Sequence, residues 1–427
     1  IFIGGLSGSR DSYLILSSFL EKPRPVLVLC TDKEEAAYMA DDLEQWAGSA
    51  RMSLFPDSFR RPRNFEEADP FQVQQRVDAL NAFNHHQGHI LVSYPEAIFE
   101  KSVSPSTIAA SRIDLAVNER LDLDDLLQKR NEFGFQRTDF VYEPGQFSLR
   151  GGILDLFSFT SDQPYRIELD DEKVESIRSF DTQTQLSVKN LSRLAIIPNF
   201  QTGFGEGIKS NFIELLDAHA VIWVKDLHAC VDALNACFEE AERWAEKMVH
   251  YEEERMIPMI RHREYISGAQ FLESIEKHRL IFFHTRPQLS DKPAFMELRS
   301  EPQPSFNKNF NLLIENIHQL NEKQYSCFIC TASSAQVERF HNIFQDLKAD
   351  IVYFPEVRSI REGFIDHDMR IACYTDHQIF SRFHGHRARQ SYTREQALSI
   401  RMLGELQPGD YVTHMDYGIG RFAGLEK

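Results

Sequence analysis

The chain opens with Ile1-Phe-Ile-Gly-Gly-Leu-Ser-Gly-Ser-Arg-Asp-Ser12, which predicts a short strand followed by a glycine-rich turn. Residues 13–20 then place apolar side chains at helical spacing, so the first unit reads strand, turn, helix. Residues 25–30 predict a second buried strand, residues 34–46 a second helix and residues 90–93 a third strand. Because apolar strands that alternate with helices are typical of parallel sheets, this part of the chain is predicted to be an α/β domain.

The pattern changes near residue 121, where a predicted helix over 122–131 leads into period-two alternation. Alternating runs at 140–142, 147–150, 153–157, 165–169 and 174–180 predict an antiparallel meander inserted in or attached to the first domain. Pro144 and Gly145 suit the two central positions of a type II turn, because Pro presets φ and Gly accepts positive φ.

The rest of the chain predicts a long helix over residues 228–256 and, after a boundary near 301–309, a second small α/β unit. That unit combines helices at 312–322 and 335–347 with strands at 325–331, 350–354 and 369–374. A charged connecting helix over 393–403 and two short strands around a Gly-x-Gly turn end the sequence. We therefore expect an α/β multidomain protein with an antiparallel β-rich insertion.

The composition excludes several classes of function. The 427 residues contain 47 Lys and Arg against 64 Asp and Glu, a net charge of −17, with 42% hydrophobic residues. This balance is globular, and so acidic a chain is not expected to bind the phosphate backbone of nucleic acid as its main task. The compact basic run at 60–63 is expected to be an exposed loop. No membrane segment or secretory signal is visible, Ile1 is expected to be internal to a longer polypeptide, and a cytoplasmic location is expected.

The six cysteines do not form a recognisable metal site. Cys327 and Cys330 have the C-x-x-C spacing of half a zinc site or of a redox pair. They lie in a predicted strand, where residues three apart point to opposite faces, and no second ligand pair follows. We expect reduced structural thiols, and no metal site.

The glycine-rich turn has the place and length of a phosphate-binding loop but lacks its chemistry. Gly5, Gly8 and Ser12 fit the pattern G-x-x-x-x-G-K-[ST] in part. Arg10 stands where the last Gly allows backbone amides to approach phosphate, and Asp11 stands where Lys supplies positive charge. A carboxylate there would repel the anion, so the loop is expected to be inactive and the chain to have no catalytic residues.

Several segments together resemble one family. Residues 135–139, the block Gly145-Gln-Phe-Ser-Leu-Arg-Gly-Gly-Ile-Leu-Asp-Leu-Phe157, residues 165–181 and residues 184–187 resemble the UvrB-homology module of bacterial transcription-repair coupling factors. Residues 409–422, with Gly418-Ile-Gly-Arg-Phe422, resemble the start of the RNA-polymerase-interacting domain of that family.

The resemblance implies a domain plan and a division of labour. It predicts a UvrB-like (RecA-like) domain 1a with a degenerate phosphate loop over 1–119, domain 2 over 120–200 and domain 1b over 201–305. A small α/β domain over 306–388, a linker helix over 389–406 and a truncated β-barrel start over 407–427 follow. The partners implied are UvrA and the RNA polymerase β subunit, while the ATP- and Mg-dependent motor that contacts DNA would lie beyond residue 427. No cofactor is expected in this chain, and the family's C-terminal region is expected to mask the UvrA surface.

The resemblance also assigns contact residues, namely Arg137, Arg150, Phe157, Arg166 and Glu168 for UvrA. Period-two alternation independently places Arg166 and Glu168 on the outer face of their strand. Ser148 stands where UvrB-like sequences often carry Arg, which would weaken charge complementarity. The alternatives are a solvated sheet face, an active UvrB-like ATP-dependent helicase subunit, or a module that binds damaged DNA directly.

Overall fold

The structure is a computed structural model that describes most of the chain. It covers residues 1–48, 51–58, 70–85, 88–104, 107, 113–121, 135–143, 145–158, 161, 163–182, 184–196, 209–248, 265–288, 293–382, 411–414 and 418–421. The chain divides into two units, Ile1–His386 and Arg387–Lys427, each of which is described by itself. The helices expected over 122–131 and 393–403 and the basic run at 60–63 lie outside the described residues.

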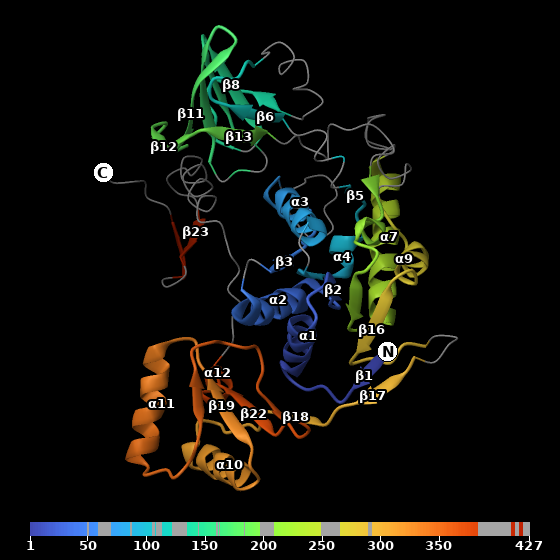
Figure 1. The fold of residues 1–427 in the computed structure, drawn as a ribbon, viewed down its shortest axis with the longest axis vertical. Coiled ribbons are helices and arrows are strands. Elements are labelled where there is room, and N and C mark those ends of the chain that lie inside the picture. Colours follow the sequence, from blue (N-terminus) through green and yellow to red (C-terminus); the bar gives the residue numbers. More distant parts are fainter. Residues whose placement is uncertain are drawn as a thin grey trace. The chain divides into compact units, whose positions relative to one another are not determined.

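A seven-stranded sheet forms the first α/β domain (Figure 1). Its strands in spatial order are β17 (Phe295–Glu297), β1 (Phe2–Gly4), β16 (Arg279–Phe283), β15 (Val221–Val224), β2 (Val26–Leu29), β4 (Ile90–Ser93) and β3 (Met52–Leu54). Every pairing in this sheet is parallel, as the alternation of strands and helices predicts. Strand β3 was not expected from the sequence.

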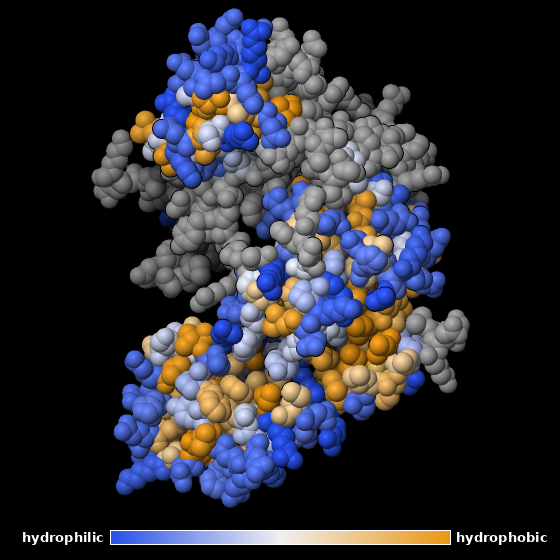
Figure 2. Space-filling view, in the orientation of Figure 1, coloured by the Kyte–Doolittle hydropathy of each residue, from blue (hydrophilic) through white to orange (hydrophobic). Residues whose placement is uncertain are grey.

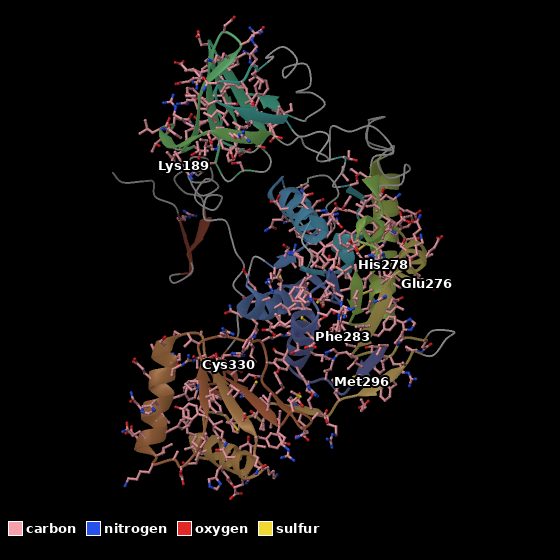
Figure 3. The ribbon with its side chains drawn as sticks, in the orientation of Figure 1. Lys189, Glu276, His278, Phe283, Met296 and Cys330 are labelled. Carbon is pink, nitrogen blue, oxygen red and sulfur yellow. The ribbon has the colours of Figure 1, made fainter. Side chains whose placement is uncertain are left out.

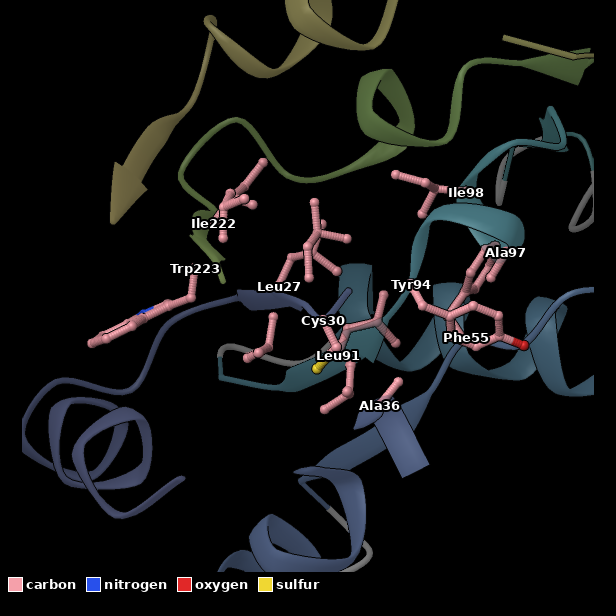
Figure 4. Close-up of a cluster of buried hydrophobic side chains, with 14 of the residues drawn as sticks. Leu27, Cys30, Ala36, Phe55, Leu91, Tyr94, Ala97, Ile98, Ile222 and Trp223 are labelled. Carbon is pink, nitrogen blue, oxygen red and sulfur yellow. The ribbon is translucent and has the colours of Figure 1, made fainter. Parts of the chain in front are cut away.

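The helices of this domain contribute buried side chains to one hydrophobic core with the sheet. They are α1 (Arg10–Glu21), α2 (Lys33–Ala47), α3 (Pro70–His85), α4 (Pro95–Ile98), α7 (Leu227–Met248) and α9 (Gly268–Ile275), with a 3-10 turn at Phe212–Leu215. Figure 4 shows part of the core, where Leu27, Leu91 and Ile222 pack as fully buried side chains. The long helix expected over 228–256 is confirmed as far as Met248, beyond which the chain is not described until residue 265.

The β-rich insertion is a six-stranded sheet. Its order is β12 (Ser187–Leu191), β11 (Lys173–Phe180), β10 (Tyr165–Asp170), β9 (Ile153–Leu156), β8 (Gln146–Arg150) and β7 (Gln136–Arg137). All neighbours are antiparallel except β7 and β8. β6 (Ile113–Ala116) and β13 (Arg193–Ile196) form a separate antiparallel pair, as do β5 (Ser102–Val103) and β14 (Lys209–Ser210).

One strand expected in this region is a loop. Residues 140–142 alternate in polarity, but they carry no strand pairing. Side chains from β8 bond the loop instead: the Ser148 hydroxyl donates to the Asp139 carbonyl at 3.0 Å, and Gln146 Oε1 accepts the Tyr142 N–H at 2.8 Å. The turn before β8 is confirmed, because Gly145 has φ 85° and the Gln146 N–H bonds the Glu143 carbonyl at 3.2 Å.

The second α/β domain has a five-stranded sheet with both parallel and antiparallel neighbours. Its order is β18 (Ser300–Pro302), β21 (Phe364–Asp366), β22 (Ile371–Thr375), β19 (Ser326–Cys330) and β20 (Phe354–Glu356). α10 (Phe310–Glu322), α11 (Ser334–Asp346) and α12 (Asp376–Ile379) complete it. The strand expected at 350–354 begins only at Phe354, after an extended segment that carries no strand pairing.

In the second unit, β23 (Tyr411–His414) and β24 (Gly418–Arg421) form the antiparallel pair of short strands that the sequence predicts. The expected turn at Gly418-Ile-Gly420 is wrong, because these residues lie within β24 and pair with β23. Across the described ranges, no helix combines the length and the apolar character needed to cross a membrane.

Candidate functional site

A buried carboxylate organises the outer face of the β-rich sheet. Asp155 of β9 is fully buried, and its oxygens accept Arg166 Nε at 2.7 Å and Arg166 Nη2 at 2.8 Å. Arg150 Nη2 donates to the same carboxylate at 2.7 Å. Three charge-assisted hydrogen bonds compensate the carboxylate for lost hydration, and the two guanidinium groups are held in fixed positions as a result. The hydrogen bonds that Arg166 donates to Asp155 raise the pKa of Arg166 above its ordinary value.

Strand alternation explains why these residues share a face. Arg166 lies opposite Asp155 in the β9–β10 register, while Ile167 faces the hydrophobic core on the other side and is fully buried. Glu168, two residues further along β10, lies on the outer face with Arg166, as expected from the sequence. Its carboxylate accepts the Ser176 hydroxyl at 2.7 Å and pairs with Arg178 of β11.

Phe157 and Arg137 lie apart from this network. Phe157 is only 6% exposed and packs with Val141 and Phe180 in a small cluster, so it offers no exposed aromatic anchor. Arg137 is exposed on the edge strand β7. Its register partner is Phe147, whose side chain belongs to the core, and paired residues on neighbouring strands share a face, so Arg137 lies on the face opposite Arg150.

Asp155 is a site residue that was not expected from the sequence, although its strand carries a signal. Asp155 is the one charged residue in the apolar strand Ile153–Leu156, and an unpaired carboxylate is rarely buried. Its position opposite Arg166 depends on strand register, which the spacing of residues along the chain does not supply.

The glycine-rich turn over residues 5–12, which resembles a phosphate loop, is the second candidate site. Backbone from the small α/β domain of the same chain packs against this turn. Gly5 and Gly8 have φ values of 72° and 55°, so the left-handed turn expected of such a loop is present. A Cβ on Gly8 would lie 2.5 Å from the carbonyl oxygen of Gly363 in the small α/β domain. The loop therefore accommodates a second backbone in the region where a working phosphate loop accommodates its ligand.

Reciprocal hydrogen bonds join the loop to the segment before β21. The Ser9 N–H donates to the Glu362 carbonyl at 3.0 Å, and the Glu362 N–H donates to Ser9 Oγ at 3.0 Å. The Arg361 N–H donates to Asp42 of α2 at 2.7 Å. A backbone carbonyl thus accepts from the loop amide at Ser9.

Arg10 and Asp11, the two residues that depart from the phosphate-loop pattern, both have partners. Arg10 Nε pairs with Asp366 of β21 at 2.7 Å, with both side chains about 96% buried. Asp11 accepts the Ser12 N–H at 2.7 Å, and its carboxylate lies 3.1 Å from His284 Nε2 and 3.8 Å from Lys225 Nζ. Arg10 and Asp11 therefore both take part in packing and ion pairing within the chain.

Asp42 accepts hydrogen bonds from both the loop and the segment before β21, and its own pKa is shifted. Its carboxylate accepts the Ser12 hydroxyl at 3.1 Å in addition to the Arg361 N–H. Burial raises the pKa of Asp42 to about 7, because desolvation outweighs the hydrogen bonds from Ser9, Arg361 and Ser12, and the nearby Asp11 adds to the rise.

The cysteines of the small domain are free thiols, of which Cys327 and Cys330 are buried. Cys327 and Cys330 lie on β19 and pack into different hydrophobic clusters, so the two side chains point to opposite faces as expected. Cys330, labelled in Figure 3, is close to Cys373 of the neighbouring strand, which raises the pKa of Cys373. Within the described ranges, no group of three or more His, Cys, Asp or Glu side chains is arranged to hold a metal ion.

Comparison with known proteins shows which protein families two regions of the chain resemble. Residues 113–201 match the UvrB interaction domain, and residues 406–427 match the CarD-like/TRCF RID domain. The first match covers the β-rich sheet with Asp155, and the second covers the terminal hairpin.

The whole chain is also similar to transcription-repair-coupling factors. It is 24% identical to that factor from Bacillus subtilis and 26% identical to that from Myxococcus xanthus, over 99% of this chain and 42% of each relative. The factor from Staphylococcus haemolyticus is 23% identical over 100% of the chain. The resemblance to this family is therefore confirmed, and the chain spans about two fifths of the length of these curated relatives.

Proposed function

We propose that this chain is the N-terminal recruitment region of a transcription-repair coupling factor and that its β-rich domain binds UvrA. The observation that supports this most is the Asp155 network, which lies inside the segment that matches the UvrB interaction domain. Two arginines share one carboxylate, so the network leaves one positive charge on the outer face of an acidic chain. Aromatic residues and Arg are enriched at the centres of protein interfaces, whereas an isolated solvated pair contributes little.

Exposure and hydrogen bonding support two different proposed roles for the five residues. Arg137 and Arg150 are exposed and are the side chains that would contact the partner. Arg166 uses Nε, Nη1 and Nη2 within the chain and is 18% exposed, so it positions Asp155 and the neighbouring turn. Phe157 is buried with Val141 and Phe180, and Glu168 pairs with Arg178 of the adjacent strand.

The test is a calorimetric titration of purified UvrA into this chain and its variants. Arg137→Ala and Arg150→Ala should each weaken binding by about 30-fold or more, because truncating one member of a charge pair at an interface costs roughly 2–5 kcal/mol. Lys277→Ala, in an exposed pair with Glu214 on the first domain, is the matched control and should leave the affinity unchanged. No binding by the unmodified chain would reject the proposal.

The competing proposal, an active ATP-dependent helicase subunit, is disfavoured by the filled phosphate loop. Nucleotide would have to displace Glu362 and Gly363 from Ser9 and Gly8 and then face the Asp11 carboxylate. We propose that the chain neither binds nor hydrolyses ATP. Micromolar binding of ATP with magnesium in a calorimetric titration would contradict this.

RNA polymerase is the second proposed partner, through the region matched by the RID domain. The described hairpin β23–β24 is two-stranded, and a lone hairpin is marginally stable in water. We propose that tight binding to the polymerase β subunit needs the remainder of that domain. Tight binding by this chain, measured with the purified subunit, would contradict that requirement.

A further inference from the structure

Four large apolar side chains of the β-rich domain are exposed beside the Asp155 network. They are Phe140 at 46%, Tyr142 at 52%, Leu186 at 68% and Val188 at 59% exposed. We propose that Phe140 and Leu186, flanked by Tyr142 and Val188, are the apolar anchors of the interface for which the arginines supply the charge. This inference rests on the UvrA-binding function proposed above and adds residues that neither the resemblance nor the assigned site includes.

The loop that carries Phe140 is fixed on both sides. Ser148 of β8 is buried and bonds the Asp139 carbonyl, while Gln146 Oε1 accepts the N–H groups of Tyr142 and Glu143. Between them Val141 is fully buried against Phe157 and Phe180. Phe140 is therefore exposed on a rigid support, and a rigid aromatic side chain loses little conformational entropy on binding. Ser148, where an Arg was expected, holds this loop in place.

A second turn presents Leu186 and is bonded to the same loop. Gln185 has φ 58°, a conformation that disfavours non-glycine residues, and its N–H donates to the Asp181 carbonyl at 2.8 Å. Its side-chain amide donates to the Val141 carbonyl at 3.3 Å, and its own carbonyl accepts Arg166 Nη1 at 3.2 Å. Arg166 thus links the charged network to the turn that exposes Leu186.

Val188 extends the surface along the edge strand β12, on which Figure 3 labels its neighbour Lys189. Asn190 pairs with Arg178 in the β11–β12 register, and Val188 is two residues from Asn190 on the same strand. Figure 2 shows apolar residues among hydrophilic ones on the surface of this domain. The exposed apolar residues and the arginines therefore occur in one compact domain.

The charges beside these residues define the chemistry of the partner. The Arg150 guanidinium lies 4.8 Å from the centre of the Phe140 ring, and Arg150 is 44% exposed. Glu168 and Arg178 balance each other, whereas Arg150 and Arg166 share the single carboxylate of Asp155. The surface that fits here is an apolar recess bordered by carboxylates, contributed by the UvrA partner.

The experiment compares matched truncations in a UvrA titration with the full chain. Phe140→Ala and Leu186→Ala should each weaken binding by about 10-fold. The controls are Phe354→Ala and Leu312→Ala on the small α/β domain, where the side chains are 46% and 49% exposed. These should change the affinity less than twofold, and thermal unfolding of all four variants should stay near that of the unmodified chain.

Two variants of opposite charge at position 186 test whether the partner surface is acidic. Leu186→Asp should weaken UvrA binding at least fivefold more than Leu186→Lys, because only the aspartate would repel a carboxylate-bordered recess. Equal affinities for these two variants would overturn the assignment of an acidic partner surface. If Arg150→Ala weakens binding while Phe140→Ala and Leu186→Ala do not, the anchors are rejected and the proposed function stands. If the unmodified chain does not bind UvrA, both fail together.

Discussion

The phosphate loop and the Asp155 face use the same type of ion pair for opposite purposes. In the loop, Arg10 and Asp366 are both almost fully buried, so the two charges neutralise each other inside the chain. On the β-rich sheet only the carboxylate is buried, while Arg166 is 18% and Arg150 44% exposed. Because only the carboxylate of Asp155 is buried, the two arginines that pair with it are held at the surface. The difference shows that the exposure of the basic partner decides whether an Arg–Asp pair is enclosed within the chain or leaves a guanidinium group at the surface.

The largest effect should follow from breaking the buried pair. Arg10→Ala leaves Asp366 buried without its ion-pair partner, although the N–H groups of Asp368 and Met369 still donate to it. The loss should lower the free energy of unfolding by about 3 kcal/mol in urea titration. UvrA affinity at a temperature where the variant is folded should not change. The double variant Arg10→Ala/Asp366→Ala removes the stranded charge and should recover part of the loss. A double variant no more stable than Arg10→Ala would show that the contact does not depend on charge pairing.

A pH effect on stability should come from Asp42 in the same region. Its pKa is about 7 in the folded chain against an ordinary value of 3.8, so the folded state binds the proton more tightly. The stability from this group is present below about pH 4 and is lost as pH rises to about 7, by an amount on the order of a few kcal/mol. Asp11, in the adjacent turn, is the charged neighbour whose repulsion adds to the effect.

The matched control is Asp42→Asn, which keeps an acceptor for the Arg361 N–H but cannot titrate. Unfolding free energies measured between pH 4.5 and 7.5 should fall less steeply for this variant than for the unmodified chain. Parallel pH profiles for the two proteins would contradict a perturbed Asp42.

Much of this contrast could be predicted from the sequence, but not all of it. Apolar periodicity predicts strands β1, β2 and β4 with their helices, and alternation predicts that Ile167 faces the core while Arg166 faces outward. The departure of Arg10 and Asp11 from the phosphate-loop pattern is also visible from residue types. These inferences succeed because each depends on local geometry along a single segment.

The remaining features depend on contacts between distant segments. Arg10 and Asp366 are 356 positions apart, and nothing in either segment indicates that they pair. Likewise, residues 140–142 have the alternation of a strand, yet bonds from Ser148 and Gln146 hold them as a loop. Burial of Phe157 depends on Val141 and Phe180 covering it. Tertiary packing decides such cases against the local pattern.

The smallest stability effect should come from the exposed member of the Asp155 network. Arg150→Ala leaves Asp155 with both bonds from Arg166, and Arg150 itself is nearly half exposed, so the free energy of unfolding should fall by less than about 1 kcal/mol. UvrA affinity should nevertheless fall strongly, which is the reverse of the expectation for Arg10→Ala. Arg150→Lys separates charge from shape, because an ammonium keeps the charge but not the planar contact with the Phe140 ring. Its affinity should lie between those of Ala and Arg. A loss of stability in Arg150→Ala as large as that in Arg10→Ala would show that both pairs hold the fold and that exposure does not separate their roles.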